Sequence, residues 1–194
     1  MTTTSESTGR KFLFLLASTR ADGNTEALAR RAAAALPAGV EQRWLRLSDL
    51  PLPTFEDIRH AERSSYPEPT GNAKVLLDAT LDATDLVIAS PLYWYNLSAS
   101  AKLYLDHWAG WLRVPGLDFK ARMAGRTIWA VTALASENPA AADPLVGAVR
   151  YSGEYLGMAW GGALLGHANS PGQILDDEAA LRSADDFFVP AAVR

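Results

Sequence analysis

Residues 18–25 have the types and spacing of an anion-binding loop. They run Ser-Thr-Arg-Ala-Asp-Gly-Asn-Thr between an apolar segment and a segment with helical periodicity. The first N–H groups of a helix have no partner within it and carry its partial positive charge, so a phosphate placed there meets several donors. Ser18 and Thr25 can add hydroxyl donors, and Arg20 can add a charge-assisted hydrogen bond. The loop therefore predicts a phosphate site.

A simpler interpretation of the same loop is that Asn24 caps the following helix after an ordinary turn. The phosphate motifs of other protein classes fit poorly. The chain has no G-x-x-x-x-G-K-[ST] motif, and no G-x-G-x-x-G follows its first apolar segment. Hydrolysis of nucleoside triphosphates and tight Rossmann-type dinucleotide binding are therefore disfavoured.

Three consecutive aromatic residues stand in a second segment, residues 90–98, which runs Ser-Pro-Leu-Tyr-Trp-Tyr-Asn-Leu-Ser. Pro91 ends the preceding apolar run, so the residues after it must leave any sheet. Aromatic side chains there can stack on a planar ring, and we expect the N–H groups of residues 93–96 to be free for its polar edge. The alternative is that Tyr93, Trp94 and Tyr95 simply pack in a core or a subunit contact.

The segments around these loops predict five strands alternating with five helices. Such alternation predicts an α/β three-layer sandwich, in which a five-stranded parallel sheet carries helices on both faces and ligands bind beyond the carboxyl ends of the strands. Pro-rich residues 48–70 have little periodicity and are expected to form a pocket wall. The expected strands are 11–17, 40–47, 85–90, 126–133 and 159–166, and the expected helices are 24–36, 71–83, 98–111, 141–156 and 176–188.

Composition narrows the chemistry further. The 194 residues include no Cys, which excludes disulfides, thiolate nucleophiles and iron–sulfur clusters, so redox chemistry would need an organic cofactor. A net charge of −4 gives no broad positive field for nucleic acid. No apolar run is long enough to cross a membrane and residues 1–10 lack a signal-peptide pattern, so we expect a cytoplasmic protein. We predict a disordered tail over residues 1–10 and a single domain over residues 11–194.

Parallel topology brings the two loops to the same edge of the sheet. One suits a phosphate and the other a flat ring, which together describe FMN. Residues 16–25 and 90–106 also resemble the NAD(P)H-dependent FMN reductase and quinone reductase group of flavodoxin-like proteins. The first segment is Leu-Ala-Ser-Thr-Arg-Ala-Asp-Gly-Asn-Thr, and the second is Ser-Pro-Leu-Tyr-Trp-Tyr-Asn-Leu-Ser-Ala-Ser-Ala-Lys-Leu-Tyr-Leu-Asp.

The resemblance implies a flavodoxin-like fold, FMN as the cofactor and NADPH or NADH as co-substrate. It assigns the phosphate and ribityl chain to the first loop and the isoalloxazine to the second. A third loop departs from the family, because Ala133 follows Thr132 where many relatives have Gly. The residues expected to bind the cofactor are Ser18, Arg20, Gly23, Asn24, Thr25, Pro91, Leu92, Tyr93, Trp94, Tyr95, Asn96, Thr132 and Ala133.

The expected activity is ping-pong hydride transfer from NAD(P)H to a quinone, free flavin or a similar planar acceptor, centred on the flavin, with no acid–base residue required for the hydride step. The alternative is a flavodoxin-type electron carrier that turns over no substrate. The family resemblance also implies a homodimer, with Tyr104, His107 and Trp111 at the contact; the alternative packs Trp111 under residues 112–119 of its own chain.

Other chemistries find little support. His60, His107 and His167 lack the spacing of metal ligands, so no metal is expected, although His167 is a candidate for acceptor contact. No G-x-S-x-G motif accompanies Ser98, which is better interpreted as a helix N-cap than as a hydrolase nucleophile.

Overall fold

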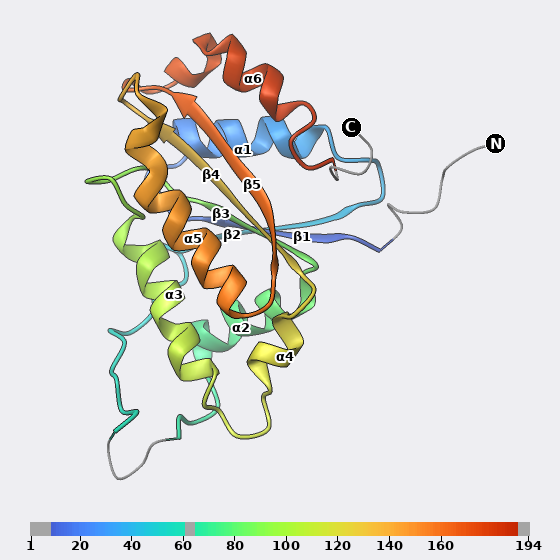
Figure 1. Ribbon diagram of the computed structural model, residues 1–194, viewed down its shortest axis with the longest axis vertical. Coiled ribbons are helices and arrows are strands. Elements are labelled where there is room, and N and C mark those ends of the chain that lie inside the picture. Colours follow the sequence, from blue (N-terminus) through green and yellow to red (C-terminus); the bar gives the residue numbers. More distant parts are fainter. Residues whose placement is uncertain (1–8, 61–64, 190–194) are drawn as a thin grey trace, which may run out of the picture.

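The computed structural model describes residues 9–60 and 65–189, which form a central sheet between two layers of helices (Figure 1). The strands are β1 (Lys11–Leu16), β2 (Glu41–Arg46), β3 (Asp85–Ala89), β4 (Thr127–Leu134) and β5 (Ala159–His167). The α-helices are α1 (Asn24–Ala34), α2 (Gly71–Asp82), α3 (Ala99–Trp111), α4 (Phe119–Met123), α5 (Asp143–Tyr155) and α6 (Glu178–Ala184).

The five strands are all parallel and lie in the order β2-β1-β3-β4-β5. This order is that of the flavodoxin-like doubly wound fold, whose switch point lies between β1 and β3. β3 is buried along its whole length, which explains why its sequence is an uninterrupted apolar run after Asp85. The predicted fold class is confirmed.

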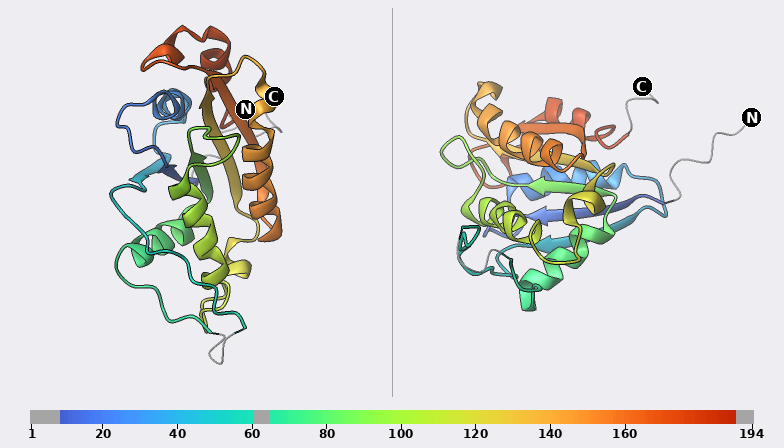
Figure 2. Two further views of the ribbon diagram at one scale, coloured as in Figure 1. Left: turned by 90° about the vertical axis from the view of Figure 1, so that its left-hand side faces the viewer. Right: turned by 60° about the horizontal axis from the view of Figure 1, so that its bottom comes forward.

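Each face of the sheet carries its own hydrophobic core. Helices α1 and α6 cover one face, where Leu28 and Ala180 pack with Phe12, Phe14 and other residues of the sheet. Helices α2, α3, α4 and α5 cover the other face, as the views of Figure 2 show. Because both faces are covered, ligands have direct access only from the edges and the loops.

Two helical predictions require correction. Helix α4 was missed, since five residues are too few to show periodicity. The last helix is shorter than the expected 176–188: the carboxylate of Asp177 accepts a hydrogen bond from the Ala180 N–H and caps the helix, so α6 starts at Glu178. Phe187 and Phe188 leave the helix and pack edge-on against Trp129.

Helical periodicity in the sequence predicts an inward stripe of Ala101, Leu105, Trp108 and Leu112 on this helix, and the inward face of α3 differs from it. Leu105 and Leu112 are only partly buried. Tyr104 and Trp111 take their places, with exposed fractions of 0% and 2%, and both rings pack edge-on within the aromatic cluster around Trp108.

This burial corrects the expected dimer contact, because Tyr104 and Trp111 lie in the core of their own chain. The ring of Trp111 packs on Phe119, as the single-chain alternative required. His107 is engaged as well, since its Nε2 lies 2.9 Å from the carbonyl oxygen of Pro53. Part of the 48–70 segment therefore packs along α3.

The first strand is anchored by a residue just before it. Arg10 Nε donates to Asp85 Oδ2 at 3.0 Å, and Arg10 Nη1 donates to the carbonyl of Phe188 at 2.8 Å. Arg10 thus belongs to the fold rather than to the tail expected over residues 1–10, of which residues 1–8 lie outside the described part of the chain.

Candidate functional site

The three predicted loops meet at the carboxyl edge of the sheet and are hydrogen-bonded to one another. The Ala17 carbonyl accepts from Ser98 Oγ at 2.8 Å and from Ser100 Oγ at 3.1 Å, which joins the first loop to the start of α3. The Ala133 N–H donates to Thr25 Oγ1 at 3.2 Å, which joins the third loop to α1. The sequence prediction that these segments share one edge is confirmed.

The first loop leaves donors available for an anion. Helix α1 begins after Gly23, and no side chain caps its first turn. Ser18 Oγ accepts from the Arg20 N–H, and Thr25 Oγ1 accepts from the Ala133 N–H. Within residues 9–60 and 65–189, neither hydroxyl hydrogen has an assigned acceptor. The loop therefore presents helix N–H groups that no side chain caps and two hydroxyl groups that are free to donate. The exposed Arg20 lies in the same loop.

Asn24 has a different position from the one its sequence suggested. It is the first residue of α1, while Gly23 occupies the N-cap position. Its side chain is committed elsewhere, since Nδ2 donates to the Ser170 carbonyl at 2.9 Å and Oδ1 accepts from the Ile174 N–H at 3.4 Å. The capping interpretation is therefore wrong, and the Asn24 side chain fixes the loop that follows β5.

The aromatic segment forms a two-residue reverse turn. The N–H of Tyr93 donates to the Asn96 carbonyl and the N–H of Asn96 donates to the Tyr93 carbonyl, both at 3.0 Å. Trp94 and Tyr95 between them have φ angles of 49° and 66°. These are the features of a type I′ turn, which favours Asn and Gly at the two central positions. Non-glycine residues held in this conformation store strain, which is typical of functional loops.

The turn changes which groups can face a ligand. We expected all the N–H groups of residues 93–96 to be free, but those of Tyr93 and Asn96 are used by the turn itself. The side chains are open: Trp94 is 93% exposed, and Tyr93 and Tyr95 are more than half exposed. The packing alternative for the three aromatics is therefore wrong within a single chain.

The third loop contributes differently from the expectation. The Ala133 N–H is taken by Thr25, so it is not free for a cofactor. Thr132 is fully buried, and its Oγ1 has no hydrogen-bond partner among the described residues. His167, at the end of β5, lies beside this loop with Nε2 3.1 Å from the carbonyl of Ala135.

A buried charge cluster beneath the first loop was missed by the sequence analysis. Glu26, in the first turn of α1, is only 3% exposed, and its carboxylate accepts hydrogen bonds from Arg30 and Arg46. Burial raises the pKa of Glu26, but the hydrogen bonds from Arg46 and Arg30 outweigh it and the net pKa is lowered. The carboxylate is therefore ionised at neutral pH.

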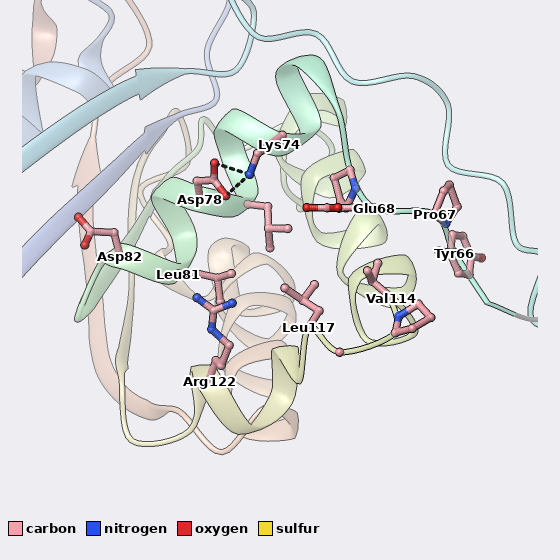
Figure 3. Close-up of a pocket in the computed structure, with 14 residues that line it drawn as sticks. Tyr66, Pro67, Glu68, Lys74, Asp78, Leu81, Asp82, Val114, Leu117 and Arg122 are labelled. Atoms are coloured by element: carbon pink, nitrogen blue, oxygen red, sulfur yellow. Dashed lines mark hydrogen bonds and ion pairs between the residues drawn. The ribbon is translucent and has the colours of Figure 1, made fainter.

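A groove lies elsewhere on the described chain. A groove of about 740 Å³ runs between α2 and the connection from α3 to α4, with Leu81, Asp82 and Arg122 at one end and the Lys74–Asp78 ion pair along its wall (Figure 3). These residues precede β3 and β4, so the groove is at the amino edge of the sheet. It contains none of the predicted cofactor residues.

Comparison with known proteins identifies the family. Residues 10–153 match the sequence profile described as NADPH-dependent FMN reductase. The chain belongs to this family. The Bacillus subtilis (strain 168) protein YwqN, whose name describes an NAD(P)H-dependent FMN-containing oxidoreductase, is 33% identical over 168 residues, which cover 86% of this chain and 90% of that protein.

Solved structures share the fold of this reductase. The Trp repressor binding protein of Bacillus subtilis superposes with a TM-score of 0.71 at 24% identity, covering 92% of this chain and 97% of that one. An FMN-dependent NADH-azoreductase of Bacillus anthracis, solved in complex with FMN, gives a TM-score of 0.65 at 13% identity and covers 91% and 96% of the two chains.

The chain is thus an FMN-dependent NAD(P)H oxidoreductase by family, and its own residues fit that cofactor. The uncapped start of α1 and the hydroxyls of Ser18 and Thr25 suit a phosphate, and the open aromatic turn suits a flat ring. Among residues 9–60 and 65–189, no three potential metal ligands gather together, and no helix is both long and apolar enough to span a bilayer.

Proposed function

We propose that this reductase transfers electrons from NAD(P)H to a quinone, free flavin or a similar planar acceptor, in two half-reactions at one site. The observation that carries the proposal is the type I′ turn, which holds the Trp94 side chain 93% exposed at the carboxyl edge of the sheet. A flat, uncommitted aromatic surface there suits the successive stacking of planar partners. Membership of a reductase family favours turnover over the role of an electron carrier.

In this proposal the first loop holds the FMN phosphate through the N–H groups of the first turn of α1, the hydroxyls of Ser18 and Thr25, and Arg20. Pro91, Leu92 and the aromatic turn flank the ring. When bound, FMN supplies the chemistry that accepts a hydride from NAD(P)H and returns electrons to the acceptor. The chain itself positions the partners, without an acid or base for the hydride step.

Steady-state kinetics test the two half-reactions. With NADPH varied at several fixed concentrations of a benzoquinone, double-reciprocal plots should give parallel lines, because each substrate meets the enzyme after the other has left. Intersecting lines would contradict the proposal. An anaerobic titration with NADPH and with NADH should bleach the flavin band within about a second, whereas a flavin unaffected by both would indicate a carrier.

The aromatic turn is tested by Trp94→Ala, with Leu175→Ala as the matched control for loss of an exposed apolar side chain at 65% exposure. We expect Trp94→Ala to raise the KM for the quinone about tenfold, on the scale of one lost stacking contact. The control should leave that KM within twofold. Equal effects of the two variants would remove the turn from the acceptor site.

We also infer that the active unit is a homodimer in the cytoplasm. The support is the exposed aromatic patch of Tyr93, Trp94 and Tyr95, because a second copy that covers one side of such a patch would complete the pocket while leaving a ring face for the planar partners. Sedimentation equilibrium at micromolar protein tests it: a fully active species near the 20.9 kDa chain mass would overturn the inference. A charged replacement of Trp111 would not test the dimer, because it would place a charge in the core of the single chain.

A further inference from the structure

A residue of the edge strand β2 reaches the proposed phosphate loop. Arg46 is the last residue of β2 and is paired in register with Leu16, the last residue of β1. The first loop begins directly after β1, so this register places Arg46 beside it. Arg46 Nη1 lies 3.3 Å from the Ser18 carbonyl and 3.2 Å from the Arg20 carbonyl, as donor to both.

The two bonded carbonyls fix the direction of the loop amides. The peptide bonds of the described residues are trans and planar, so each carbonyl is antiparallel to the N–H that follows it. With the carbonyls of Ser18 and Arg20 turned toward Arg46, the N–H groups of Thr19 and Ala21 are turned away from it. Arg46 therefore holds these two carbonyl acceptors on its own side of the loop and leaves the two N–H donors on the opposite side.

The same guanidinium neutralises an acid. Arg46 Nη2 donates to Glu26 Oε2 at 2.5 Å, while Arg30 donates to Glu26 Oε1 through Nη2 at 2.7 Å. Glu26 lies in the first turn of α1, so an unbalanced carboxylate there would repel any anion bound at that helix terminus. The Arg46 side chain is 17% exposed, so solvent screens this pair only in part.

Other residues of β2 hold this arrangement. Trp44, two residues before Arg46 and on the same face, stacks on Phe14 at 4.0 Å, and the guanidinium of Arg30 lies over its ring at 4.5 Å. Both arginines that bond Glu26 are thus positioned by β2. The Arg43 side chain is exposed and has no hydrogen bond or ion pair with any residue of the described ranges 9–60 and 65–189, which makes it a natural control on the same strand.

We propose that Arg46 is a positioning residue for the cofactor phosphate, which turns the carbonyls of Ser18 and Arg20 away from it and cancels the charge of Glu26. The inference rests on the proposal that the first loop binds the FMN phosphate. It concerns the phosphate alone, so the vitamin without a phosphate, riboflavin, is the natural comparison ligand.

The test is binding of FMN and of riboflavin to the flavin-free full-length chain, followed by quenching of flavin fluorescence. Arg46→Met should weaken FMN binding about tenfold to hundredfold, on the scale of lost charge-assisted interactions, and riboflavin binding less than threefold. Arg43→Met removes the same charge from the same strand and should change neither affinity more than twofold. Adding Glu26→Gln to Arg46→Met should recover only the part of the lost FMN affinity that comes from the uncancelled charge of Glu26, and no recovery would overturn the charge-cancelling role.

Each contrary result has a distinct meaning. Equal weakening of FMN and riboflavin by Arg46→Met would show a merely structural role and overturn the inference, as would unchanged FMN binding. A native chain that binds the two flavins equally would overturn the phosphate site as well. If Arg46→Met does not fold, Arg46→Lys allows the same comparison of FMN with riboflavin, because a single ammonium cannot span two carbonyls and a carboxylate. FMN binding should then weaken at least threefold more than riboflavin binding. The absence of such a selective loss would overturn the inference.

Discussion

The turn at residues 93–96 should lower the stability of the fold while serving turnover. The double substitution Trp94→Asn with Tyr95→Gly should therefore raise stability and lower turnover. Both central residues have positive φ, and the left-handed conformation costs a non-glycine residue about 1 kcal/mol or more. Asn-Gly is the favoured pair for a type I′ turn. Trp94 is 93% exposed, so its removal loses little packing.

The expected gain is smaller than the sum of the two strains. Glycine loses more backbone entropy on folding, which offsets about 0.5 to 1 kcal/mol. The flavin-free double variant should therefore be about 1 to 2 kcal/mol more stable than the native chain, which corresponds to a rise in Tm of roughly 2 to 8 °C. Its turnover with a quinone should fall at least tenfold, because the proposed stacking surface is gone.

The assay is thermal unfolding of the flavin-free proteins, because bound FMN would add its own stabilisation. Tyr151→Gln is the matched control: Tyr151 is 62% exposed on α5 without positive φ, and its replacement should change stability by less than about 0.5 kcal/mol. A double variant that is no more stable than the native chain would refute the reasoning from strain. Full turnover would refute the assigned function of the turn.

Three further changes have defined outcomes. Arg20→Ala should weaken FMN binding about tenfold in fluorescence quenching, on the scale of a lost charge-assisted hydrogen bond. Its Tm in calorimetry should stay within about 1 °C, because this exposed side chain has no assigned contact among the described residues. Unchanged FMN binding would remove Arg20 from the site. On α5, Gly153→Ala should destabilise the chain by about 1 to 3 kcal/mol in denaturant titration, because the added Cβ would lie 2.4 Å from a side-chain carbon of Ile128. Its matched control on the same helix, Gly147→Ala, has room for the methyl group and should stabilise the chain by up to about 1 kcal/mol. Stability changes of the same sign for both variants would contradict this account. Asp177→Ala should cost about 1 kcal/mol at pH 7, because hydrogen bonds from the backbone lower the pKa of this cap. The stabilisation is therefore fully present above the ordinary value near 3.8 and is lost as pH falls through the lowered pKa. A cost that does not decline as pH is lowered below 3.8 would argue against that linkage.

Local pattern was enough for the elements and for the shared edge. An uninterrupted apolar run such as residues 11–16 fits a strand covered on both faces, and the alternation of strands and helices leaves few parallel topologies. Since parallel strands end at the same edge, residues 18–25 and 90–98 had to meet there. Ser98 was recognised as an N-cap from its type and position, and its Oγ does accept from the Ala101 N–H.

The structure alone decided which groups at that edge are free. Asn24 resembles a cap in the sequence, but its side chain is used by Ser170, far along the chain. The periodicity of α3 left Trp111 at the edge of the apolar stripe, and only the packing of Phe119 against it determined its burial. These outcomes depend on neighbours brought together by the fold.

Arg46 shows the physical reason most clearly. Its residue type and its place at a strand end indicate nothing about a phosphate, and its partners Ser18, Arg20 and Glu26 are at least 20 residues away. The parallel register of β1 and β2 aligns Arg46 with Leu16 and thereby sets it beside the loop. The sequence by itself determined which segments meet at the candidate site, because periodicity and turn chemistry are local. The tertiary structure decided which donors and charges remain available there, because those depend on long-range pairing.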